Sequence, residues 1–126
     1  MKKQKQKTPG PSGWRRGYKV VIVVSQIPDV RPEIFVSCSA IYGEVRYIPG
    51  RVTTPQPGCG PLCVFTTKKD ARKFINYLGG RNLRMFHCTY TPSAETKAWN
   101  TLGYESPHFP PGTRLAAQVV ISVEAE

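Results

Sequence analysis

Acidic residues and histidine are scarce in this sequence. Its 126 residues include eight Asp and Glu and two His, against 18 Lys and Arg, which gives a formal net charge of +10 at pH 7. The acidic residues are scattered, so no two carboxylates are placed for general acid and base catalysis. His87 falls in a predicted strand and His108 in a proline-rich loop, positions more typical of structural and surface histidines than of catalytic ones. We therefore expect a binding protein with no catalytic residue and no cofactor.

Long apolar runs and nucleotide-binding motifs are also missing. No run is long enough to span a bilayer, and the start, Met-Lys-Lys-Gln-Lys-Gln-Lys, is not followed by the apolar segment of a secretory signal. Gly58 and Gly60 precede a predicted strand and lack the Lys-Ser/Thr pair of a phosphate-binding P-loop, which opens directly into a helix. These absences lead us to expect a cytoplasmic, intracellular protein with no membrane partner.

The four cysteines do not have the spacing of a metal site or a disulfide framework. Cys59 and Cys63 form one spaced pair, whereas His87 and Cys88 are neighbours on a predicted strand and so face opposite sides of it. A tetrahedral zinc site needs two well-placed pairs of ligands. We therefore expect no metal site, and thiols that stay reduced inside the cell. Whether these three cysteines and His87 meet in space is left open by the sequence.

One helix is predicted in detail, between a cap at Thr66 or Thr67 and the glycines at 79 and 80. Thr66 or Thr67 can cap its start with a hydroxyl, and Asp70 places a negative charge in the first turn, where it suits the helix dipole. Gly79 and Gly80 supply the left-handed conformation that ends a helix. Apolar residues at i, i+3, i+4 and i+7 form the face that is expected to meet a core, namely Ala71, Phe74, Ile75 and Leu78.

Strands are predicted before and after this helix. Apolar, β-branched and aromatic runs bounded by turn residues predict strands at 18–24, 34–42, 45–48, 62–65, 83–90 and 115–123, and Ser93 opens a short second helix that reaches Leu102. The first strand is expected to be buried on both faces. The last one is expected to direct four alternate side chains to one face, those of Ala117, Val119, Ile121 and Val123.

This order of elements predicts an α+β fold. We expect a single small domain over residues 18–126, built on an antiparallel or mixed sheet of about six strands with one main helix packed on a face. Residues 1–17 are polar, basic and interrupted by proline and glycine, so we expect a disordered basic arm.

The positive charge is concentrated in two places. Residues 1–19 contain seven basic residues and no acidic one, and residues 67–84 contain six basic residues against Asp70. The basic side chains of the helix lie away from its apolar face. An arm and a helix face of this kind predict backbone-directed, salt-dependent binding to nucleic acid, because no base-reading motif is present. The predicted nucleic-acid-binding residues are Lys2, Lys3, Lys5, Lys7, Arg15, Arg16, Lys68, Lys69, Arg72, Lys73, Arg81 and Arg84.

One stretch resembles a group of known sequences. The pattern Gly58-x-Gly-Pro-Leu-x-Val-Phe65, followed by Ala71-x-x-Phe74, by a strand ending near His87-Cys88 and by Pro111-Gly-Thr113, resembles small uncharacterised proteins of phage and prokaryotic genomes. The resemblance spans roughly residues 18–123 and implies a shared fold and a viral or bacterial source. A viral source would place the protein in the host cytoplasm or the virion. No activity is implied.

Three alternatives stay open beside nucleic-acid binding. The basic surface can meet an acidic protein partner, as in a phage-type inhibitor or structural component. Arg15 or Arg16, then Ser37-Cys-Ser39, then Glu124-Ala-Glu126 resemble the arginine, Ser-x-Ser and Glu-x-Glu elements with which ADP-ribosyltransferases grip NAD and polarise the nucleophile. Finally, the charge can belong to an ordinary solvated helix face and a solubilising terminus.

Overall fold

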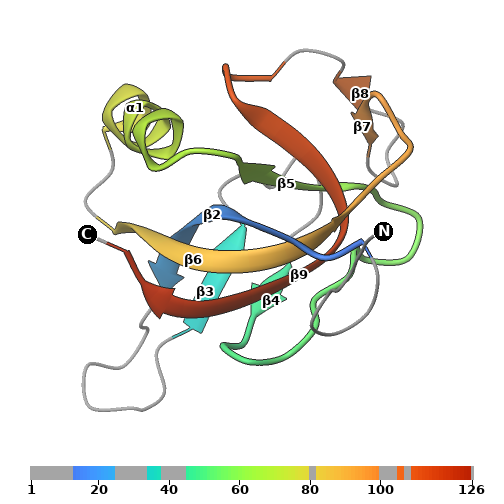
Figure 1. Cartoon of the computed structure of the whole chain (residues 1–126), viewed down its shortest axis with the longest axis horizontal. Helices are drawn as coiled ribbons and strands as arrows, with labels where there is room; N and C mark the ends of the chain where they lie inside the picture. The colour runs from blue at the N-terminus through green and yellow to red at the C-terminus, as the bar shows by residue number, and fades with distance from the viewer. Residues whose placement is uncertain are drawn as a thin grey trace, which may run out of the picture.

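A computed structural model of the chain describes residues 13–24, 34–37, 45–79, 82–99, 105–106 and 109–125. Strands make up most of this part of the chain, and a helix lies on one side of them (Figure 1). The elements in chain order are β2 (Arg15–Val24), β3 (Ile34–Ser37), β4 (Arg46–Tyr47), β5 (Leu62–Phe65), α1 (Lys68–Leu78), β6 (Leu83–Pro92), β7 (Ala98–Trp99), β8 (Glu105–Ser106) and β9 (Thr113–Glu124).

Four of the strands close into a barrel. Strand β2 pairs with β5 and β6, and β9 also pairs with β5 and β6, so the order β2, β5, β9, β6 returns to β2. Strands β3 and β4 extend the sheet from β2 outside this ring, and every pairing between named strands is antiparallel. The mostly β architecture with one main helix agrees with the predicted α+β class. The expected six-stranded sheet is wrong, because the pairing of β2 with β6 closes four strands on themselves.

Strand β2 holds this arrangement together because three strands pair with it. On one edge its residues 15–22 pair with residues 83–90 of β6. On the other edge Tyr18 pairs with Phe65 of β5, and residues 21–24 pair with β3. The strand begins at Arg15, so residues 15–17, which the sequence analysis placed in the basic arm, belong to the barrel. Residues 1–12 of that arm lie outside the described residues.

The buried side chains form two clusters, one inside the barrel and one between the barrel and α1. Successive residues of β2 point to opposite faces, so Val21 enters the inner cluster and Val20 the outer one. The prediction that this strand is buried on both faces is confirmed there. The inner cluster consists of Val21, Val45, Tyr47, Leu62, Val64, Phe86, Cys88, Tyr90, Ala116, Val119 and Ile121, and the outer one of Val20, Phe65, Ala71, Met85 and Ala125.

Helix α1 begins and ends where its sequence predicts. The Thr67 hydroxyl accepts a hydrogen bond from the Asp70 backbone N–H over 3.1 Å, and Gly79 ends the helix with φ at 69°. Phe74 and Ile75 pack against the outer cluster, as expected. Leu78 is 43% exposed, contrary to the prediction, because the last helical turn extends past that cluster. In the described part of the chain, no helix is long and apolar enough to cross a membrane.

Strand β9 departs from the predicted alternation because it contains extra residues. Thr91 pairs with Gln118 and Pro92 with Ala116, which leaves Ala117 without a partner in the ladder, and a second irregularity lies between the pairs made by Phe86 and Cys88. A bulge of this kind changes the face on which the following side chains lie. Of the four residues predicted to share one face, Val119 and Ile121 are buried, whereas Ala117 is exposed and Val123 is 66% exposed.

The predicted helix from Ser93 to Leu102 is wrong over its described part. The Ser93 hydroxyl accepts a hydrogen bond from the Glu95 N–H, which makes a local turn. Strand β7 follows and pairs with β8, and the Trp99 backbone exchanges two hydrogen bonds with Gly60. These tertiary hydrogen bonds replace those of a helix. Residues 100–102 lie outside the described residues.

Candidate nucleic-acid interface

The exposed side of α1 carries a cluster of positive charge. We call Lys68, Lys69, Arg72 and Lys73 the cationic face; all four side chains are exposed. None of them makes a salt bridge with a residue that the structure describes. The helix has one acidic residue, Asp70, and its carboxylate accepts a hydrogen bond from the Thr67 hydroxyl over 2.9 Å. The charge of this face is therefore left to interact with solvent and with external anions.

The spacing of the cationic face places an aromatic ring beside it. Lys69, Lys73 and Tyr77 are four residues apart, so they follow one another along the same flank of the helix. Each step advances about 6 Å along the axis, at 1.5 Å per residue. Tyr77 is 84% exposed, the largest exposure among the large hydrophobic side chains described. Two cations and an exposed ring thus form one continuous strip.

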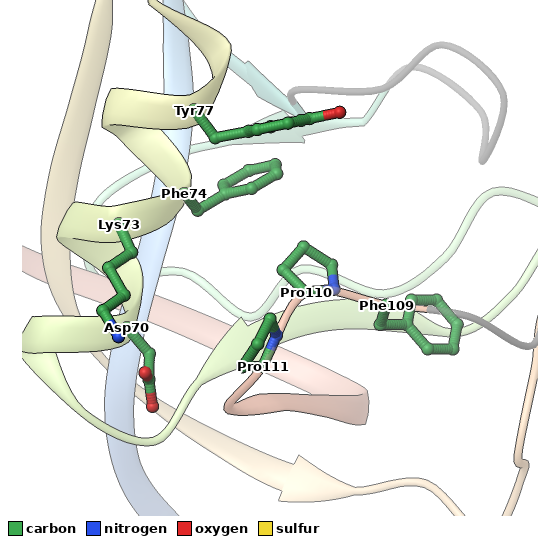
Figure 2. Close-up of a pocket in the computed structure, with 7 residues that line it drawn as sticks. All are labelled: Asp70, Lys73, Phe74, Tyr77, Phe109, Pro110 and Pro111. Atoms are coloured by element: carbon green, nitrogen blue, oxygen red, sulfur yellow. The ribbon is translucent and has the colours of Figure 1, made fainter.

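A groove opens between this flank of α1 and the turn that leads into β9 (Figure 2). Its volume is about 490 Å³. Figure 2 shows the rings of Phe74 and Tyr77 projecting from the helix on one side of the space, with Pro110 and Pro111 facing them. The Phe74 ring is anchored, since its centroid lies 5.2 Å from that of the buried Phe65 ring. The lining residues are Asp70, Lys73, Phe74, Tyr77, Phe109, Pro110 and Pro111.

The proline side of the groove is held by hydrogen bonds. The Thr66 N–H donates to the Gly112 carbonyl over 3.1 Å, and Thr113 donates to the Pro110 carbonyl through both its N–H (3.2 Å) and its hydroxyl (2.6 Å). Gly112 has φ at 82°, and a side chain there would collide with the Asp70 carboxylate. A glycine is therefore needed to dock the turn against the start of α1. The groove has two fixed walls, one of which is the helix itself.

The other predicted binding residues are not gathered at this site. Arg84 is committed to an ion pair with Glu124, with 3.3 Å between Nη1 and Oε1. Arg15 and Arg16 are exposed at the start of β2. Arg16 and His87 border a separate hollow of about 310 Å³. The centroid of the His87 ring lies 5.2 Å from that of the Tyr18 ring. The remaining predicted residues, Lys2, Lys3, Lys5, Lys7 and Arg81, lie outside the described residues.

The elements that resemble an ADP-ribosyltransferase are separated along the sheet. Arg16 pairs with Thr89 and Glu124 with Phe86, so their positions lie three residues apart along β6. At a strand rise of about 3.4 Å per residue this separation is about 10 Å. Glu124 accepts its hydrogen bond from Arg84 rather than from the predicted arginines. Ser39 and Glu126 lie outside the described residues.

Two cysteines and a buried lysine meet near the barrel wall. Lys19 is 6% exposed, its ammonium donates to the Cys63 carbonyl over 2.6 Å, and Nζ lies 5.0 Å from the centroid of the Tyr47 ring. Burial raises the pKa of the Cys88 thiol to about 12 and also raises the pKa of Cys63, while the positive charge of Lys19 opposes both shifts. These thiols are protonated at neutral pH and are poor nucleophiles.

The three cysteines that the structure describes do not assemble with His87 into a metal site. Cys88 lies in the inner cluster, and the neighbouring His87 is exposed on the outside of the barrel, as the alternation of a strand requires. Cys59, Cys63 and Cys88 are free thiols. Among the residues described, no three His, Cys, Asp or Glu side chains are grouped so that they could hold a metal ion.

Sequence reasoning missed three features of this structure. Tyr77 lies outside the apolar stripe of α1 and was not singled out, although an aromatic residue off the stripe of an amphipathic helix is a signal of an exposed contact site. Lys19 was counted only in the positive charge of residues 1–19, yet its place within a strand predicted to be buried on both faces indicates a buried lysine. The groove itself has no local signal, because Pro110 and Pro111 reach α1 only through tertiary contacts.

Comparisons with known proteins do not assign this site. A scan against protein-family models gives no match, and searches of curated proteins and of solved structures give none either.

Proposed function

We propose that the protein binds the phosphate backbone of nucleic acid through the cationic face of α1. The observation that carries this proposal is the charge itself: Lys68, Lys69, Arg72 and Lys73 are exposed, adjacent and without salt bridges to described residues. Arg84 provides the contrast, because its charge is offset by Glu124. The four lysines at positions 2, 3, 5 and 7 add to the positive potential that attracts a polyanion.

The energetics of such binding come from counterion release. Each lysine or arginine that neutralises a phosphate adds about 0.9 to the slope of log affinity against log salt on duplex DNA, and about 0.7 on a single strand. Four contacts from the cationic face give a slope of about 3 to 4 on this basis. Affinity must then fall steeply between low and physiological salt. Contacts from uncharged groups would make the affinity depend much less on the salt concentration.

A pair of charge reversals tests this assignment. Lys69→Glu with Arg72→Glu inverts two positions of the cationic face, whereas Arg46→Glu with Arg51→Glu inverts two exposed arginines on β4 and the turn after it. Both double variants lower the formal net charge from +10 to +6. Figure 1 shows α1 and β4 on opposite sides of the barrel. The two proteins are therefore matched in charge and differ in where it changes.

The measurement is fluorescence anisotropy with labelled DNA and RNA over a salt series, with circular dichroism and thermal unfolding to confirm the fold. We expect the helix variant to bind at least about tenfold more weakly, because two phosphate contacts disappear. The slope of its log affinity against log salt should be smaller in magnitude by about two. The β4 variant should lose only the weaker contribution of net charge. Equal losses in both variants would refute α1 as the interface and would make the attraction a property of the whole surface.

A further inference from the structure

The groove beside the cationic face has the properties of a site for a flat, apolar ring. Its volume of about 490 Å³ falls within the range typical of ligand pockets. Five of its seven lining residues are aromatic or proline, and the exposed Tyr77 forms its outer edge. An exposed apolar surface that is bordered by charge commonly marks a binding site. The groove lies next to the cationic face, so one ligand can contact both.

Both walls of the groove are anchored, and an exposed ring projects over the space between them, which suits stacking. Phe74 is fixed against the buried Phe65, and the turn carrying Pro110 and Pro111 is held by the hydrogen bonds of Thr113 and Gly112. The Tyr77 ring is 84% exposed and projects over the same space from the helix. A planar ring entering the groove would meet the face of Tyr77 on the helix side and the prolines opposite (Figure 2).

The charges around the groove favour an anionic ligand. Lys73 lines the groove directly, and Lys69 lies one helical turn away on the same flank. Asp70 is the one carboxylate in the lining, and it is engaged by the Thr67 hydroxyl at the start of the helix, where its charge meets the helix dipole. The ligand that fits therefore combines a flat apolar ring with a neighbouring negative group. A proline-rich peptide would use the ring contacts but leave both lysines unused.

We propose that the groove takes an unstacked base of single-stranded nucleic acid, which stacks on Tyr77 while adjacent phosphates contact Lys73 and Lys69. The inference rests on the proposed function and adds to it a preference for single strands. In a duplex only the edges of the bases are accessible in the grooves, whereas single strands offer their faces to aromatic side chains. Stacking of this kind tolerates every base, in agreement with the absence of a base-reading motif.

The experiment compares three labelled ligands of equal length: oligothymidylate, a duplex, and an oligonucleotide whose central residues are abasic. The abasic strand keeps the phosphates and removes the rings. The protein variants are Tyr77→Ala, which removes the ring, Tyr77→Phe, which keeps it, and Val52→Ala as a control at an exposed apolar residue outside the groove. Tyr77 is so exposed that its replacement leaves the core unchanged, which thermal unfolding verifies.

We expect the unsubstituted chain to bind oligothymidylate about tenfold more tightly than the abasic strand, a fold-change within the range measured for base–aromatic stacking. Tyr77→Ala should lower the affinity for oligothymidylate by about the same tenfold factor, and should change the affinity for the abasic strand little. Tyr77→Phe and Val52→Ala should keep the discrimination. This pattern assigns the loss to the contact between ring and base rather than to charge or folding.

Three outcomes would overturn the inference. Equal affinity for oligothymidylate and the abasic strand, with the salt slope intact, would reject the base site and leave backbone binding by α1 in place. Equal loss of affinity for all three ligands in Tyr77→Ala would show that Tyr77 does not act by stacking on a base. No salt-dependent binding to any ligand, together with Tyr77-dependent binding of a proline-rich peptide, would reject both the inference and the proposed function.

Discussion

The glycine that docks the proline turn on α1 allows a quantitative prediction. Gly112 has φ at +82°, and a Cβ built there would lie 2.7 Å from the Asp70 Cβ and closer still to its carboxylate. Gly112→Ala therefore combines a left-handed backbone, which costs a non-glycine residue about 1 kcal/mol, with a steric overlap against the first turn of the helix. Overpacking of this kind costs about 1–3 kcal/mol more.

A second glycine separates the two contributions. Gly50 has φ at +84° but nothing within 4 Å of the position of an added Cβ, so Gly50→Ala carries only the backbone cost of about 1 kcal/mol. We expect Gly112→Ala to lower the free energy of unfolding by about 3 kcal/mol. For a chain of 126 residues, 1 kcal/mol corresponds to about 4 °C in Tm. The expected decreases in Tm are then about 12 °C for Gly112→Ala and about 4 °C for Gly50→Ala.

Thermal and urea unfolding followed by circular dichroism measure both variants. Adding Asp70→Ala to Gly112→Ala removes the overlapping carboxylate and should recover part of the loss, although the helix then lacks its acidic first-turn residue. Equal destabilisation by the two glycine variants would refute the reasoning. It would mean that the turn before β9 does not press against the start of α1, and that the wall of the groove is not fixed as described.

Two further predictions concern the helix cap and the buried thiol. Thr67→Ala removes the hydroxyl that accepts a hydrogen bond from the Asp70 N–H, and should lower the free energy of unfolding measured in urea by about 1 kcal/mol. Thr54→Ala, at an exposed loop position, should change the free energy of unfolding little. Equal effects of the two substitutions would show that Thr67 does not stabilise the helix as a cap. The pKa of Cys88 is raised from 9.0 to about 12, so its protonated form stabilises the fold fully below pH 9, and that contribution is lost as pH rises toward 12. The free energy of unfolding should therefore fall more steeply from pH 9 to 12 in the unsubstituted protein than in Cys88→Ala. Iodoacetamide at pH 8 should label Cys59 before Cys88, as peptide mapping would show. Parallel pH profiles of the two proteins, or rapid labelling of Cys88, would contradict its burial.

The elements of this fold could be predicted where their signals are local. Helix α1 is specified by signals close together in the sequence, so capping chemistry predicted its end at Gly79 and narrowed its cap to Thr66 or Thr67, of which the structure uses Thr67. The short apolar run that forms β5 was likewise found at its observed position, 62–65. The cationic face could also be predicted, because the helical period places its basic residues outside the apolar stripe that contains Ala71, Phe74 and Ile75.

Closure of the barrel could not be predicted, because it depends on which strands pair. The run of apolar residues in β2 indicates burial on both faces but does not reveal that one edge is shared between β5 and β3. The extra residues in β9 change the face of Ala117 and Val123, and β9 itself has no glycine or proline to mark them, although Pro92 of β6 lies at one of the two irregularities. The groove was missed for a related reason, since Tyr77 and Pro110 are far apart in the sequence.

The position of β9 in the ring also determines when the barrel can close during synthesis. Strand β9 pairs with both β5 and β6, and residues 113–124 leave the ribosome after every other strand of the barrel. Until then β5 and β6 each expose an edge that is open to unwanted pairing with other chains. Because the pairings that close the ring join distant parts of the sequence, folding is expected to be slow for a chain of this size. We expect the nascent chain to depend on protection of those edges during synthesis, and to gain its barrel in a single late step.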